Sequence, residues 1–173
     1  TLSRRMAYAL VHDDNLSEAV EILERSQTRI LNESLDLTRS PKVLSSPLPA
    51  FDDICRVVQQ ERPLIYIVST LAGGVALIVT VDGVVNLQLD NLTESSIRDL
   101  FDIWKDTYSQ LQTNRSSWLD MIESSLKQLW QPLMAPLVDY LNQNNFQQAT
   151  LIPTGLLNFF PLHAAYTEDP SIL

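Results

Sequence analysis

The clearest pattern of apolar residues lies in the middle of the chain. Three apolar, β-branched runs follow one another at 64–71, 75–81 and 84–89, separated by Gly73-Gly74 and by Asp82-Gly83. Runs of this length bounded by glycine predict strands, and Asp-Gly between two of them predicts a type I′ hairpin. We therefore expect a three-stranded antiparallel meander. Its middle run is apolar on both faces, so other elements should cover each face.

Apolar residues at helical spacing precede the meander. Residues 4–37 predict two helices joined by a polar turn at Asp13–Asn15. Residues 38–50 contain three prolines and are the best candidate for a linker. A short helix over 51–61 should then place one apolar stripe on its surface, at Phe51, Ile54, Cys55 and Val58.

Two longer helical runs follow the meander, at 94–112 and 116–130. Thr93 is placed to cap the first of them, because a threonine oxygen accepts from the free N–H groups of the first turn. Pro132 lacks a backbone N–H and should end or kink the second run. Pro136 marks a further kink or the start of a new helix that continues to residue 141.

A short apolar segment near the end of the chain completes the predicted sheet. Residues 149–152 read as a buried strand that Pro153 and Gly155 stop, and residues 156–173 show no clean period. Because helices separate this strand from the meander, a right-handed crossover can return it to the same sheet in parallel. The predicted fold class is α/β, a mixed sheet flanked by helices.

The net charge and the composition limit the classes of molecule that the chain is expected to bind. The net charge is −9 over 173 residues; residues 1–62 have a net charge of −2 and residues 63–173 a net charge of −7. A nucleic acid or an anionic membrane needs a basic surface, so we expect neither as a partner. No apolar run approaches the roughly 20 residues of a membrane-crossing helix. A single cysteine excludes an internal disulfide, and a cytoplasmic location is the default.

The side chains that could carry chemistry have simpler interpretations. Cys55 lies on the apolar stripe and is expected to act as a small core residue. His12 is expected to be a surface imidazole and His163 a structural histidine. Three carboxylates at helical spacing predict a solvated helix face, Asp99, Asp102 and Asp106. We therefore assign no catalytic, cofactor-binding or metal-binding residue and expect no cofactor.

One segment resembles a known family. The run ATLIPTGLLNFFPLHAA at 149–165 resembles the signature of the CHAT family, caspase-like domains that follow tetratricopeptide repeats; the matching positions are Ile152, Pro153, Gly155, Leu157, Pro161 and Leu162. Residues 19–31 look like the repeat helix that precedes such domains, with Ser26 and Gln27 where Gly-Arg is usual. Residues 62–83 look like the opening hairpin of the domain.

The resemblance implies a relative of cysteine endopeptidases that use a His–Cys dyad. In that family both catalytic residues follow the segment that matches 149–165, so no residue here aligns with either of them. The implied organisation is a repeat-like helical lead-in at 1–40, a linker at 41–50 and the N-terminal part of a CHAT domain at 51–173. Within that domain, the strand that ends near position 154 is expected to be an inner strand.

Three interpretations of function remain open. The chain is the non-catalytic N-terminal portion of a caspase-like cysteine endopeptidase or regulator, or it is a protein-interaction scaffold without catalytic activity. A third, an unrelated α/β domain, would be favoured by a sheet without a fourth strand parallel to the meander. In each of the first two cases the expected partner is a protein or peptide. A sheet that continues elsewhere exposes an edge, which also predicts self-association.

Overall fold

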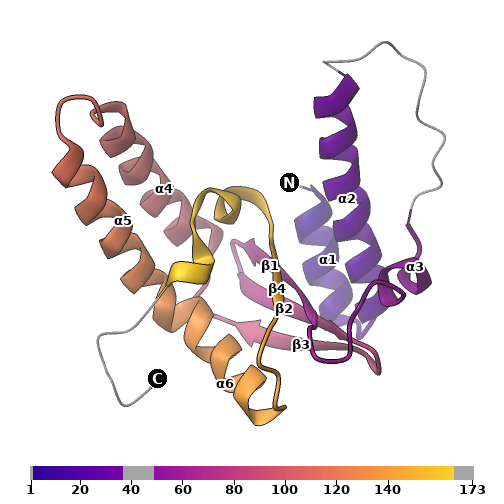
Figure 1. Cartoon of the computed structure of the whole chain (residues 1–173). Coiled ribbons are helices and arrows are strands. Elements are labelled where there is room, and N and C mark those ends of the chain that lie inside the picture. Colours follow the sequence, from indigo (N-terminus) through magenta and orange to yellow (C-terminus); the bar gives the residue numbers. More distant parts are fainter. Residues whose placement is uncertain (1, 37–48, 166–173) are drawn as a thin grey trace.

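The protein is a mixed α/β structure in which helices flank both faces of a four-stranded sheet (Figure 1). The computed structural model describes the backbone of residues 2–36 and 49–165 and the side chains of residues 2–29 and 49–165. Most of the predicted linker, and the last part of the predicted irregular tail, lie outside the described residues.

The sheet has the strand order β3-β2-β1-β4. Its strands are β1 (Leu64–Thr70), β2 (Gly73–Thr80), β3 (Gly83–Leu89) and β4 (Thr150–Pro153). The first three form an antiparallel meander, and β4 pairs with β1 in parallel. The meander and the parallel fourth strand are therefore confirmed, and the arrangement that would have favoured an unrelated domain is absent.

The position of β4 corrects one expectation. Among the described residues β4 is an edge strand, whereas the sequence predicted an inner strand. Its inner side pairs with β1, but no described strand lies on its outer side. An inner position for β4 requires a further strand there.

The two hairpins are closed by the same four-residue device. Thr70 pairs with Gly73 across Leu71-Ala72, and the Thr70 hydroxyl donates to the Gly73 carbonyl at 2.8 Å. Thr80 repeats this arrangement with Gly83, at 3.3 Å. Gly83 lies outside the two-residue loop, with φ of 132°, and neither loop residue has a positive φ. The predicted type I′ turn is therefore wrong, because that type needs a positive φ at both loop positions.

Three helices cover one face of the sheet: α1 (Leu2–His12), α2 (Leu16–Asp36) and α3 (Phe51–Cys55). The first two form the predicted helical hairpin, and Figure 1 shows both standing on the same side of the strands. Their apolar residues pack with the sheet in one core that includes Ala7, Val20, Leu23 and Tyr66. The helical lead-in thus packs directly on the sheet.

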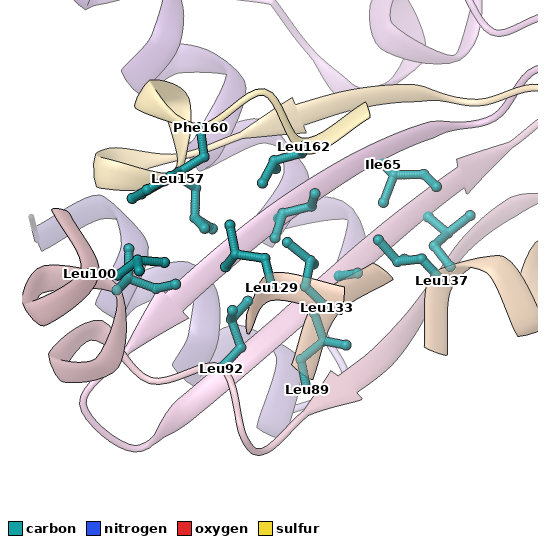
Figure 2. Close-up of a cluster of buried hydrophobic side chains, with 14 residues drawn as sticks. Ile65, Leu89, Leu92, Leu100, Leu129, Leu133, Leu137, Leu157, Phe160 and Leu162 are labelled. Carbon is teal, nitrogen blue, oxygen red and sulfur yellow. The ribbon is translucent and has the colours of Figure 1, made fainter. Parts of the chain in front are cut away.

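The opposite face is covered by the segment between β3 and β4 and by the turns after β4. Its helices are α4 (Glu94–Ser109), α5 (Arg115–Leu129) and α6 (Ala135–Gln143), and two 3₁₀ turns follow at Gly155–Phe159 and Leu162–Ala164. Figure 2 shows the second core, where Leu129, Leu133 and Leu157 meet between these elements and the strands. Because both faces are covered, seven of the eight residues of β2 are buried, as predicted.

One helical expectation needs correction and one is confirmed. The helix at Phe51 ends at Cys55, not at 61, and Gln59 and Arg62 form a β-bridge instead. Pro132 interrupts the α-helical run, as expected: α5 ends at Leu129, and a π-helical turn at Trp130–Met134 joins it to α6. In this wider turn the Ala135 N–H donates to the Trp130 carbonyl, five residues back, and the turn accommodates a proline that has no N–H to donate.

Candidate functional site

The candidate site lies where the two parallel strands end. β1 and β4 run in the same direction, so their carboxyl ends meet at one edge of the sheet. In open α/β sheets ligands bind outside such ends. Here the edge is formed by Ser69 and Thr70 at the end of β1 and by Thr154 and Gly155 after β4.

Thr154 fixes the end of β4 to β1. Its backbone N–H and its side-chain hydroxyl both donate to the Ile67 carbonyl, at 3.1 and 2.9 Å. The side chain is buried, with 4% of the residue exposed. A buried hydroxyl without a partner would destabilise the fold, so this double contact gives the threonine a specific place.

Gly155, which was expected to stop the strand, turns the chain with a φ of 62°. The left-handed conformation is unfavourable for residues with a Cβ. Space gives a second reason for glycine: a Cβ at this position would lie 2.6 Å from the Arg4 Nη1 atom and 2.8 Å from its Cζ. The turn after β4 is therefore shaped around a side chain of α1.

Arg4 is a buried cation at this edge. Its guanidinium donates to the Ser69 carbonyl at 3.3 Å and to Glu94 Oε1 at 3.4 Å. The side chains of Arg4 and Glu94 are 10% and 13% exposed. Burial alone would raise the pKa of Glu94, but the positive charges of Arg4 and Arg98 outweigh it, so the pKa lies below its ordinary value.

The second helix of the lead-in reaches the same edge. Gln27 Nε2 donates to the Pro153 carbonyl at 3.2 Å. Further along the same face, the Tyr66 hydroxyl donates to Glu24 Oε2 at 2.8 Å. We call Arg4, Gln27, Glu94 and Thr154 the carboxyl-edge clamp, because together they tie α1, α2 and α4 to the ends of β1 and β4.

A small cavity of about 150 Å³ opens beside the clamp. Its polar lining comes from α1, α2 and the turn after β4: Arg4, Ser26, Gln27, Thr154, Gly155 and Asn158. These groups can bind a peptide backbone or a small polar ligand. No cysteine or histidine lines the cavity, so its described residues position groups and supply no thiol nucleophile.

The residues considered from the sequence lie elsewhere. Cys55 packs against the first core, as expected, and its thiol pKa is raised by burial and by Asp52. His12 is exposed, with its ring against Tyr8, which confirms a surface imidazole. His163 is also exposed, so the structural role predicted for it is wrong. Its neighbour Leu162 supplies the packing, at 3% exposure.

The carboxylates on α4 form the solvated face that their spacing predicted: Asp99, Asp102 and Asp106 are all exposed. Within residues 2–36 and 49–165, no group of three or more histidine, cysteine or carboxylate side chains could hold a metal ion. In the same residues, no helix combines the length and the apolar character needed to cross a membrane.

The sequence alone does not identify most of the residues of the carboxyl-edge clamp. Arg4 is one of two adjacent arginines, and nothing in the local pattern separates it from Arg5. Gln27 was seen only as a departure from a repeat helix. The one visible signal was the Pro153-Thr154-Gly155 turn. Compared with known proteins, the chain matches no family model and no curated protein sequence.

Proposed function

We propose that the chain is the non-catalytic N-terminal portion of a CHAT-domain protein, whose parent is a cytoplasmic caspase-like cysteine endopeptidase or a regulator of one. One observation supports this proposal most strongly. The Ile152–Gly155 segment, on which the resemblance depends, ends a strand that is parallel to β1 and that has no described strand on its outer side.

The arrangement gives the chain a role in such an enzyme. Further strands would add in parallel at the outer side of β4, since its inner side is already paired with β1. Each added parallel strand would bring its carboxyl end to the edge that the clamp occupies. A histidine and a cysteine at the ends of those strands would then stand next to Thr154 and Gly155.

The clamp would define one wall of that site. Thr154 holds the end of β4, and Arg4 and Gln27 connect it to the helices that resemble the end of a repeat array. Effective nucleophilic catalysis needs reacting groups held in a fixed geometry. In this proposal the described chain supplies that rigidity, and the later strands supply the dyad.

The test uses the full parent chain that contains these residues. It is expressed and treated with a peptide acyloxymethyl ketone, a reagent that alkylates an activated cysteine. We expect covalent labelling of a cysteine downstream of residue 173, at the end of a strand, and equal labelling of a Cys55→Ser variant. A parent without a downstream histidine and cysteine, or labelling that Cys55→Ser abolishes, would contradict the proposal.

A second function is favoured by a different observation. Away from the sheet, the hairpin of α4 and α5 exposes large apolar side chains at Ile103, Tyr108 and Leu119, each more than half exposed. Such residues are suited to protein contacts. A parent that binds a protein without any cysteine labelling would be the scaffold.

The expected self-association also stays a prediction, which light scattering across a concentration series tests.

A further inference from the structure

The outer edge of β3 lacks the features that normally protect an edge strand. Its seven residues, Gly83–Leu89, include no charged residue and no proline, and they pair with β2 in unbroken register without a bulge. Natural proteins shield exposed edges with charges, prolines, bulges or very short strands. β4 at the opposite edge has two of these features, since it is four residues long and ends in Pro153.

The register determines which backbone groups of β3 point outward. The Thr154 N–H donates to the Ile67 carbonyl, so the odd-numbered residues of β1 face β4 and its even-numbered residues face β2. Backbone direction alternates along a strand. In β2, the odd-numbered residues therefore face β1 and the even-numbered residues face β3. In β3, the odd-numbered residues then face β2, so the N–H and C=O groups of Val84, Asn86 and Gln88 point away from the sheet.

An acidic groove continues from the carboxyl end of this edge. It has a volume of about 330 Å³ and lies between the end of β3 and the start of α6. Asp90 and Asp139 line it from opposite sides, and both are exposed. None of the residues that line it is basic. With a net charge of −7 over residues 63–173, the surrounding field also attracts a cation.

We propose that β3 binds an extended segment of a partner protein by strand addition. The segment pairs antiparallel with Val84, Asn86 and Gln88, since antiparallel pairing is the more stable arrangement. It is uncharged along its middle and has a basic residue near its N-terminal end. That end lies beside the carboxyl end of β3, where the basic side chain enters the groove between Asp90 and Asp139. This inference does not depend on the proposed function.

Charge disfavours a second copy of the chain as the occupant. In a symmetric antiparallel pair centred on Asn86, Asp82 of one copy would face Asp90 of the other, at both ends of the pair. Like charges directly opposite each other destabilise strand pairing. A segment with an arginine or lysine at that position turns one of these unfavourable contacts into a favourable one.

Two synthetic heptapeptides test the charge requirement. Both alternate threonine and valine and carry blocked termini and a fluorescent label; one begins with arginine and its control begins with glutamate. By fluorescence anisotropy at low salt, the arginine peptide should bind at least about 5-fold more tightly, and the difference should shrink as salt screens exposed charges. Asp139→Asn should reduce the preference for arginine. Equal binding of both peptides would overturn the proposal.

Two further peptides test the strand pairing without changing the protein. Both have the arginine sequence with N-methyl groups on alternate residues; one blocks one set of alternate backbone N–H donors, and the other blocks the other set. One version should lose binding by about 10-fold or more, since only one set faces β3. Equal binding by both versions, or a dimer of the chain that pairs through β3 and excludes the peptide, would overturn the proposal.

On the protein side, Asn86→Pro removes an outward N–H in the middle of β3, and Asn86→Thr keeps it. The proline variant should lose peptide binding while its far-ultraviolet circular dichroism matches that of the threonine variant. Peptide binding that survives Asn86→Pro in a folded chain would also contradict strand addition at this edge.

Discussion

The two edges of the sheet differ in what holds them. At the carboxyl end of β4, Gln27 donates to the Pro153 carbonyl, Thr154 donates to the Ile67 carbonyl of β1, and Arg4 lies against Gly155. At β3, a longer strand turns the backbone groups of Val84, Asn86 and Gln88 away from β2, and no described strand pairs with them. The carboxyl end of β4 is held in one geometry, whereas no described strand pairs with the outward backbone groups of β3. The difference shows that buried polar contacts, and not strand length, mark the edge where structure is fixed.

Removing the central cation should have the largest effect. Arg4→Ala leaves Glu94 as a buried carboxylate with one cation fewer and removes the donor to the Ser69 carbonyl. We expect the free energy of unfolding to fall by about 3 kcal/mol, the usual cost of breaking a buried pair. Urea denaturation measures it. The control Arg5→Ala changes an exposed neighbour and should cost less than about 0.5 kcal/mol; equal losses in the two variants would show that the clamp does not stabilise the fold.

Two proline substitutions test the open edge. The N–H of Val85 faces β2, whereas the N–H of Asn86 faces outward, and both residues are exposed. Val85→Pro should therefore cost about 2 kcal/mol more unfolding free energy than Asn86→Pro, because only the first removes a hydrogen bond inside the sheet. Thermal unfolding of both variants gives the difference, and the reverse order would show that the strand faces the other way.

The close approach of Gly155 to Arg4 should produce an intermediate effect. Gly155→Ala places an alanine in the left-handed conformation, which costs about 1 kcal/mol of unfolding free energy. It also places a Cβ in steric conflict with the Arg4 guanidinium. We expect a total loss of about 2 kcal/mol, of which only the backbone part remains when the same change is made in Arg4→Ala. Additive losses in the double variant would mean that the two residues do not constrain each other.

The smallest effect concerns pH. The folded pKa of Glu94 lies below its ordinary value of 4.5, so its contribution to stability is complete above that pH and is lost as the pH falls through the lower folded value. The stability difference between the unmodified chain and Glu94→Gln should therefore be largest at neutral pH and shrink in acid. Denaturant titrations of both at pH 7 and at about pH 3 measure it; a difference that grows in acid would contradict the assignment.

The sequence predicted the elements better than their connections. Periodicity and β-branching identified the meander, the helical hairpin and the parallel fourth strand, because these depend on burial along one element. The π-helical turn at Pro132 and the early end of α3, followed by the Gln59–Arg62 bridge, are local departures from a regular helix, which apolar periodicity does not contain. The prediction of a type I′ turn failed because Gly83 pairs with Thr80 and therefore lies one residue outside the two-residue loop.

The candidate site was harder to predict for a related reason. Gly155 was visible in the sequence because, with Pro153, it was expected to stop the strand, and β4 does end there. Arg4 lies 151 positions before Gly155 in the chain, and only the packed fold brings them together.

Hydrogen exchange of single backbone amides, followed by NMR, compares the two edges most directly. The Thr154 amide should be strongly protected in the unmodified chain and lose much of that protection in Arg4→Ala. The amides of Val84, Asn86 and Gln88 should exchange nearly as fast as in an unfolded chain and become protected when the arginine peptide is added. Protected β3 amides in the free chain, or a Thr154 amide that exchanges freely, would contradict the account of one fixed edge and one open edge.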